Sequence, residues 1–443
     1  MAEVEGNGIG PFQETQNDVF SHAIDLFQAT KQEKSILRGR DICYRPLNMN
    51  SSGPFEFVVA SQSGFYKHMP NFRLYGKTRI VKEDGTAINS DEQNISIVNM
   101  FPASLFRSIT VEVNGHNVAD LGSAAAHYKA YIETILSYGN DARLGHLTAA
   151  MFDMDDPGEF DSLNGHNMGY ARRQRHIQNS KIFDWEIPIS SDFLRADKIL
   201  PPGNDLTVKL TRNEDSFSIL TEDEGRYKVE ILELKLYTRL LEVNPAIVAY
   251  HAREWEKHPL VYPINRTVVQ NWNVPIGSNH TNVGPLFRGH LPKSVVVGMV
   301  SSTAYNGAQG QNPYRFQHFN CNRINLMVKG VSVPTDPYTP DFENGLFARE
   351  YNGLFQQSGI KISNEGNCIS REQFIGGSYL QAFDLTADNC NGFHQHPPED
   401  GTIDLELKFS TVLEEPITVI IYAVFDAEVT INLDRHALTN ILG

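Results

Sequence analysis

A weak internal repeat restricts the possible folds of this sequence more than any other feature. The segment FDWEIPISSD (183–192) is followed 200 positions later by FDLTAD (383–388). DLTVKL (205–210) recurs as DLELKF (404–409), at an offset of 199. Each half then closes with a long segment of strand character, KVEILELKLYTRLLEV in the first and TVIIYAVFDAEVTINL in the second. A matching order at a nearly constant offset predicts that one folding unit is used twice.

The repeated unit has the pattern of β-structure. Near the end of the chain, Val429, Ile431 and Leu433 alternate with polar residues, which is the period of two expected for a half-buried strand. Glycine and proline are spread along the whole chain and separate short apolar runs, as in many strands joined by turns. Further segments with strand character are 55–60, 108–114, 205–211, 229–239, 293–300, 324–333 and 417–425.

A chain of 443 residues with 41% hydrophobic side chains is long enough for two cores. We therefore predict an all-β protein of two tandem jelly-roll β-sandwiches, a double jelly roll, with few short helices and long loops. The spacing of the strands leaves room for long loops at 139–182 and 334–374. The predicted division is an N-terminal arm, a first jelly roll, a linker and a second jelly roll, over 1–34, 35–244, 245–263 and 264–443.

Three segments are predicted to be helical. In AHYKAYIETILSY (126–138), Tyr128, Tyr131, Ile132, Ile135 and Leu136 fall on one face. The arm contains an amphipathic pattern over 17–30, where Phe20, Ala23, Ile24 and Phe27 form an apolar stripe. We interpret it either as an arm that docks on a neighbouring subunit, or as a helix packed on its own domain. The linker has room for a short helix around 245–256.

The composition narrows the class of protein. A formal net charge of −15 argues against a protein whose main partner is a phosphate backbone, because such proteins carry a basic face. Four scattered cysteines without a CxxC pair are typical of reduced thiols rather than of a disulfide framework. We expect no signal peptide and no membrane span, hence synthesis inside a cell without secretion.

A collinear series of blocks carries a family resemblance. The segment FRSITVEVNGHNVADLGSAAAHYKAYIETILSYG (106–139) resembles the first jelly roll of the major capsid proteins of Polinton (Maverick) elements and adintoviruses. The segment IFDWEIPISSDFLRADKILPPGNDLTVKL (182–210) is similar to that family's strand–loop–strand segment. Further blocks match in order at 258–269, 286–300, 304–319 and 369–385, so the resemblance spans roughly residues 100 to 435.

The resemblance implies a hexon-like major capsid protein and no catalysis. In that family two jelly rolls stand side by side, three copies form a six-sided capsomer, and capsomers tile an icosahedral shell with a separate penton protein. It thus implies a homotrimer in a virion, with penton and minor capsid proteins as partners and weak or indirect contact with DNA. No catalytic, cofactor-binding or metal site is predicted. The polar and aromatic residues of 304–319 and 351–357 suit interfaces between subunits.

The main alternative is a metal-dependent tandem-cupin enzyme. His394, His396 and Glu399 resemble a fragment of the cupin metal motif, and two imidazoles with a carboxylate are suitable ligands for iron, manganese or nickel. The carboxylate comes one residue too early, however, and the first half has no equivalent histidine around 185–200. Cys390 adds too few ligands for a zinc site. A two-sandwich glycan-binding or glycan-cleaving protein is a third possibility, but it would be expected to have a signal peptide and disulfides.

Two charged clusters have simpler interpretations. The acidic run is Asp153, Asp155, Asp156, Glu159 and Asp161; it lacks the spacing of a calcium loop, and we interpret it as a solvated loop. The basic cluster is Arg172, Arg173, Arg175 and His176. We expect it to pair with acidic residues across a subunit boundary, with contact to packaged DNA as the alternative.

Overall fold

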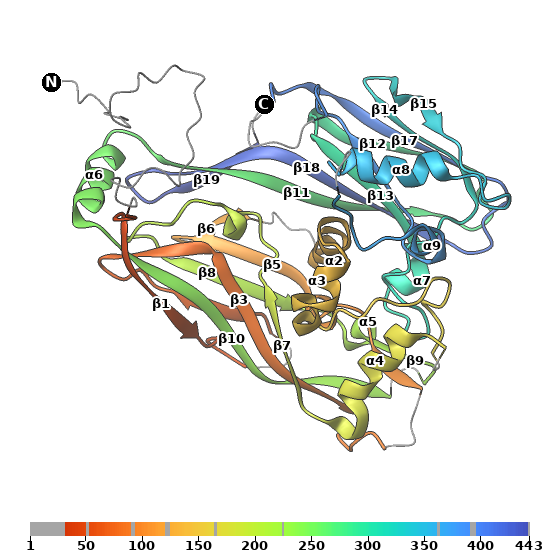
Figure 1. Cartoon of the computed structure of the whole chain (residues 1–443), viewed down its shortest axis with the longest axis horizontal. Helices are drawn as coiled ribbons and strands as arrows, with labels where there is room; N and C mark the ends of the chain where they lie inside the picture. Colours follow the sequence, from red (N-terminus) through yellow and green to blue (C-terminus); the bar gives the residue numbers. More distant parts are fainter. Residues whose placement is uncertain are drawn as a thin grey trace, which may run out of the picture.

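The computed structural model is built mainly from antiparallel sheets, in two sandwiches (Figure 1). The structure describes residues 32–49, 53–89, 94–119, 125–163, 166–223, 226–360, 364–389 and 396–441. The predicted arm helix (17–30) lies outside the described residues.

The first sandwich contains eight principal strands in two four-stranded sheets. One sheet has the spatial order β1 (Ile36–Tyr44), β10 (Tyr227–Val243), β3 (Phe65–Lys82) and β7 (Phe183–Pro188). The facing sheet has the order β2 (Phe55–Val59), β8 (Leu206–Arg212), β5 (Phe106–Val113) and β6 (His116–Ala119). A separate two-stranded sheet pairs β4 (Ile95–Ile97) with β9 (Ile219–Thr221).

The second sandwich repeats this arrangement. One sheet has the order β11 (Leu260–Val274), β18 (Ile417–Ile431), β13 (Ser294–Ser301) and β16 (Leu380–Asp384), with β19 (Ala437–Ile441) added beside β18. The other has the order β12 (His280–His290), β17 (Asp400–Phe409), β14 (Cys321–Val328) and β15 (Val331–Tyr338).

Both sandwiches have the jelly-roll topology. If the principal strands of each are numbered from its own first strand, both contain one sheet of order 1-8-3-6 and one of order 2-7-4-5. The repeated sequence segments fall on equivalent strands: β7 and β16 are sixth strands, β8 and β17 seventh, and β10 and β18 eighth. The predicted double jelly roll is therefore confirmed.

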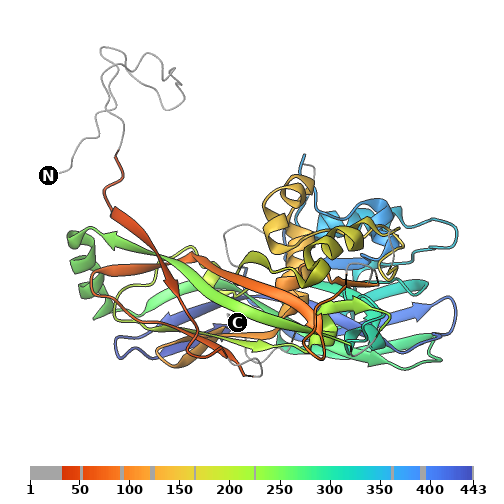
Figure 2. The same ribbon diagram turned by 90° about the horizontal axis from the view of Figure 1, so that it is seen from below.

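The helices lie mostly in connections. Their bounds are α1 Phe101–Ser104, α2 Ala126–Ser137, α3 Asn140–Leu144, α4 Met168–Ile177, α5 Asp215–Ser218, α6 Pro245–Trp255, α7 Ser302–Tyr305, α8 Ala348–Gln357 and α9 Arg371–Gly376. Short 3-10 turns are η2 His146–Ala150, η3 Gln178–Ser180 and η4 Phe193–Arg195. In each sandwich a helical insertion separates the fifth strand from the sixth: α2 to α4 in the first, α8 and α9 in the second. Figure 2 shows both insertions on the same side of the sheets.

The two hydrophobic cores are interlocked. Buried residues of α2, such as Tyr131 and Ile135, belong to the same apolar cluster as the interior of the second sandwich. In the opposite direction, Tyr262 of β11 and Val429 and Ile431 of β18 belong to the core of the first sandwich. Each half of the chain therefore contributes apolar side chains to the core of the other half.

Two predicted helices are confirmed, and one predicted strand is wrong. The helix at 126–138 is α2, and the one around 245–256 is α6. The segment 324–333 is a hairpin rather than a single strand, because Lys329 and Gly330 have φ values of 53° and 77° and form a two-residue turn between β14 and β15. Residues 260–263, which the predicted division assigns to the linker, are the first residues of β11.

Glycine is required at one position in the middle of β3. Gly76 lies opposite Trp185 of β7, and a Cβ atom on Gly76 would lie 2.2 Å from the Trp185 ring. Trp185 is buried in the core of the first sandwich, so its ring has little room to move.

We expect Gly76→Ala to lower the free energy of unfolding by about 1–3 kcal/mol, since it overpacks a filled core. Urea unfolding followed by circular dichroism measures this. Gly53→Ala is the control, because nothing lies within 4 Å of the position that its methyl group would occupy. Equal stability of the two variants would contradict the packing argument.

Candidate functional site at the joint between the two jelly rolls

The joint between the two sandwiches is built around helix α2 and a stack of aromatic rings. The Tyr131 ring stacks on Tyr314 with centroids 4.2 Å apart and an interplanar angle of 4°. The Tyr128 ring stacks on Tyr305 at 5.6 Å, and its hydroxyl donates to the Pro313 carbonyl at 3.0 Å. The residues at 305–314 connect β13 to β14, so the insertion of the first jelly roll packs directly on a loop of the second.

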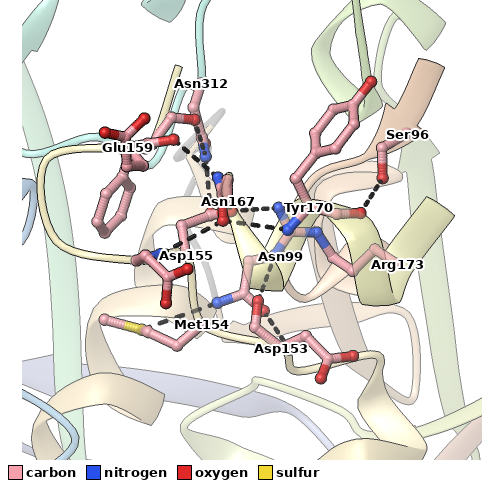
Figure 3. A network of polar contacts seen from close by, with 12 residues as sticks. Ser96, Asn99, Asp153, Met154, Asp155, Glu159, Asn167, Tyr170, Arg173 and Asn312 are labelled. Atoms are coloured by element: carbon pink, nitrogen blue, oxygen red, sulfur yellow. Dashed lines mark hydrogen bonds and ion pairs between the residues drawn. The ribbon is translucent and has the colours of Figure 1, made fainter. Parts of the chain in front are cut away.

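A buried ion pair lies beside these rings. Arg173 of α4 and Asp155, in the loop that precedes α4, are both fully buried, and Arg173 Nη2 lies 2.5 Å from Asp155 Oδ1. Arg173 Nε also donates to the carbonyl of Ile97 in β4 at 2.7 Å. Asn167, the N-cap of α4, donates its amide to the same Asp155 oxygen at 2.9 Å. Figure 3 shows how these side chains converge on Asp155.

The second jelly roll contributes directly to this network. The Asn312 side-chain amide donates to Asp155 Oδ2 at 2.9 Å (Figure 3). The Gln373 side chain, from α9, donates to the Asp155 backbone carbonyl at 2.8 Å. Asp161 accepts a hydrogen bond from the Asn312 backbone at 2.7 Å and forms an ion pair with Arg315. Asp155 thus connects the helical insertion of the first jelly roll to two parts of the second jelly roll. These are the connection between β13 and β14, and the helical insertion that contains α9.

The electrostatics of this pair follow from its burial. Removal from water raises the pKa of Asp155, whereas Arg173 and the amides of Asn167 and Asn312 oppose this by stabilising the charged form. A buried carboxylate is tolerated only when it is paired and fully hydrogen-bonded, and here both oxygens have partners. The network therefore depends on the correct relative position of the two jelly rolls.

A second polar cluster joins the sandwiches on the other side of α2. Lys129 Nζ lies 2.5 Å from Asp192, and both side chains are more than nine-tenths buried. Asp192 also accepts the backbone N–H of Thr267 in β11 at 2.8 Å. Glu133 pairs with Arg195 at 2.7 Å and accepts from the Tyr422 hydroxyl of β18 at 3.3 Å. Residues of α2 and η4 are therefore tied to the first sheet of the second jelly roll.

The interpretation of the acidic run as a solvated loop is wrong for Asp155, which is fully buried. Asp156 accepts the backbone N–H of Met168 at 2.7 Å, and Glu159 accepts a hydrogen bond from Ser162. The expectation that the basic cluster pairs across a subunit boundary is also wrong for two members. Arg173 pairs with Asp155 and Arg172 with Asp153, at 3.9 Å, within the same chain. Two members of the acidic run, Asp153 and Asp155, thus pair with two members of the basic cluster.

The aromatic residues of 304–319 are predicted to lie at interfaces between subunits. The structure instead places Tyr305, Tyr314 and Phe316 against Tyr128 and Tyr131 of the same chain. The sequence gives no indication that Asn312 and Gln373 belong to the site, because an isolated amide side chain carries no local signal for burial.

The two described residues of the cupin motif, His396 and Glu399, have different partners. His394 and Cys390 lie outside the described residues. His396 Nε2 lies 2.8 Å from Asp388, and Glu399 pairs with Lys329 at 2.8 Å with two-thirds of its side chain exposed. Among the described residues, no group of three or more His, Cys, Asp or Glu side chains is arranged to hold a metal ion.

Comparisons with known proteins establish the fold. No protein-family model matches the chain. An uncharacterized protein of Caenorhabditis elegans is 24% identical over 411 residues, which cover 88% of this chain and 94% of that protein. A chain in the cryo-EM structure of the Sputnik virophage has a TM-score of 0.60 at 12% identity, over 98% of this chain and 94% of the other. The mavirus major capsid protein has a TM-score of 0.56 at 10% identity, over 98% and 97%.

We expect Asp155→Asn to lower the free energy of unfolding by about 3–5 kcal/mol, because it leaves the Arg173 charge buried without a counter-charge. Chemical unfolding at pH 7 measures the loss. The matched control is Asp153→Asn, whose partner Arg172 is half exposed, and which should cost less than about 1 kcal/mol. A similar loss for both variants would show that the buried pair has no special role.

The burial of His127 on α2 predicts that acid lowers the stability of the joint. Its ring is buried against Phe217, and burial lowers its pKa to about 3. The unfolded chain binds a proton near pH 6.5, whereas the folded chain stays neutral there. The free energy of unfolding should therefore fall between about pH 6.5 and 3, by up to about 1.4 kcal/mol per pH unit from this group.

The measurement compares the unmodified chain with His127→Gln by urea unfolding at several pH values. The variant should lose less stability on acidification, and the difference should begin below pH 6.5. A difference that stays constant from pH 7 to pH 4 would contradict the prediction.

Proposed function

We propose that this protein is a major capsid protein that assembles into the shell of a virus or virus-like element. One observation carries the proposal: two jelly rolls of the same topology are joined into one unit by the Asp155 network and the α2 rings. Two solved structures with this fold are the major capsid proteins of mavirus and of Faustovirus, and the chain matches 97% and 92% of their lengths. Two sandwiches that are firmly joined form a rigid unit, which is suitable for the wall of a capsid.

The proposed assembly is a homotrimeric, pseudo-hexagonal capsomer that tiles an icosahedral shell around a DNA genome. Three copies of a subunit with two similar sandwiches place six similar units around one axis. Such a ring has heterologous contacts, in which one face of each subunit meets a different face of the next. The collinear sequence blocks between residues 100 and 435 support the Polinton or adintovirus lineage. A relative from an animal, matched over 94% of its length, supports a gene carried in a host genome.

The proposed location is the virion, where the protein is a structural component without catalysis. Its partners are a penton protein, minor capsid proteins and neighbouring capsomers. Contact with DNA is weak or indirect, in line with the net charge of −15. No helix among the described residues is both long and apolar enough to span a bilayer. We also propose domain boundaries at 34/35 and 244/245, with the linker ending before β11 begins at Leu260 rather than at residue 263.

The tandem-cupin alternative has less support. It needs His394, His396 and Glu399 to converge on one ion, whereas Glu399 is engaged with Lys329 and is largely exposed.

The solution mass of the purified protein, measured by light scattering with negative-stain images of the same peak, tests the proposal. We expect a species of about three times 49.8 kDa, seen as six-sided rings or as closed shells. The paired variant His394→Ala with His396→Ala is the control and should assemble like the unmodified chain. A stable monomer that loses a bound transition metal and an activity in this variant would overturn the proposal in favour of the enzyme.

A further inference from the structure

An apolar groove of about 690 Å³ lies between helix α6, the first jelly roll and the start of β11. Val248, Ala252 and Trp255 of α6 form one wall, and Tyr66, Ile199 and Pro201 contribute to the other. None of the residues of α6 is buried, although the helix carries several apolar side chains. Because short helices in proteins are stabilised mainly by packing of an apolar face, α6 has the composition of a helix with a further partner.

The polar atoms of the aromatic rings around this groove are already engaged. The Tyr66 hydroxyl lies 3.0 Å from His251 Nδ1, and the Tyr262 hydroxyl donates to the Ile199 carbonyl at 3.1 Å. Trp255 Nε1 donates to the Ile431 carbonyl at 3.1 Å. What these rings present to the groove is therefore their apolar faces, which favours an apolar partner over a polar small molecule.

The described chain begins beside this groove. Asn244, the N-cap of α6, donates its backbone N–H to the Ser35 carbonyl at 2.9 Å and its side-chain amide to the Lys34 carbonyl at 3.3 Å. Four residues of extended chain reach at most about 14 Å, so a segment that ends at residue 30 is joined to the N-cap of α6 by a short connection. The N-terminal segment is consequently tethered at one end of the groove.

The sequence pattern of that segment matches the groove in spacing. Its apolar stripe runs from Phe20 through Ile24 to Phe27, and the groove face of α6 runs from Val248 through Ala252 to Trp255. Both stripes span seven residues, which is about 10 Å along a helix. Two such stripes can pack side by side as ridges into grooves.

We propose that residues 17–30 form a helix that docks into the α6 groove of its own chain. The tether at Asn244 fixes the direction as antiparallel to α6, which places Phe27 opposite Val248, Ile24 opposite Ala252 and Phe20 opposite Trp255. This inference does not depend on capsid assembly, since every measurement below uses the purified full-length chain.

The first test measures amide hydrogen exchange of α6. In the full-length variant Phe20→Ser, Ile24→Ser, Phe27→Ser, the α6 amides should exchange about tenfold faster than in the unmodified chain, with β10 unchanged. A synthetic peptide of residues 15–31 should restore their protection. Equal α6 exchange in the variant and the unmodified chain would overturn the proposal.

Two single substitutions on α6 provide a matched pair. Ala252→Glu places a carboxylate in the groove and should raise α6 exchange as much as the stripe variant does. Ala249→Glu lies on the same helix outside the groove lining and should leave the exchange within about twofold of the unmodified chain. The same increase in both would mean that the effect is on helix α6 itself, and would overturn the docking proposal.

Cross-linking distinguishes docking within one chain from docking between two copies of the chain. The full-length variant Phe27→Cys with Val248→Cys, in a Cys43→Ser background, is treated with a short bismaleimide and analysed under denaturing conditions. A cross-linked monomer that is absent from each single-cysteine variant supports the proposal. A cross-linked dimer would overturn docking within one chain and assign the groove to the arm of a second copy.

Discussion

The buried carboxylate of Asp155 is the constraint on which the arrangement of the two jelly rolls depends. It has lost its water, so the structure is stable only while Arg173, Asn167 and Asn312 all point at it. Those donors come from α4, from the cap of α4 and from a loop of the second jelly roll. Apolar residues of similar volume could supply comparable stability, but hydrogen bonds add direction, and a direction is what fixes one sandwich relative to another.

The interlocked cores extend this constraint over the whole molecule. Buried side chains of helix α2 belong to the apolar cluster of the second jelly roll. The first residues of β11 and the last residues of β18 belong to the cluster of the first jelly roll. Neither sandwich could rotate without exposing side chains such as Tyr131 or Val429, which are both fully buried. The large apolar area supplies the stability of the joint, and the polar network selects its geometry. The proposed role as a repeating subunit of a capsid wall requires two sandwiches held in a fixed relative orientation.

The sequence predicts well whatever depends on local pattern and poorly whatever depends on distant partners. The period of two and the repeat at an offset of 199 to 200 identify equivalent strands, because each strand carries its own alternation. The same pattern misses the hairpin at Lys329-Gly330, because a turn of two residues interrupts it so briefly. The prediction of a solvated Asp155 fails because its partners Arg173, Asn312 and Gln373 lie 18, 157 and 218 positions away. No property of the acidic run itself indicates that burial.

The joint also determines which surfaces remain for other subunits. The aromatic residues of 305–316, which have the composition of an interface, are already covered by α2 of the same chain. Within the described residues, the edge strands of the four large sheets include β1, β11 and β15, each paired with only one neighbour. Trp272 of β11 and Val331 of β15 expose 44% and 63% of their surface. Since an unpaired strand edge with apolar side chains readily accepts another chain, the contacts of the proposed capsomer should form at such edges rather than at the aromatic loop.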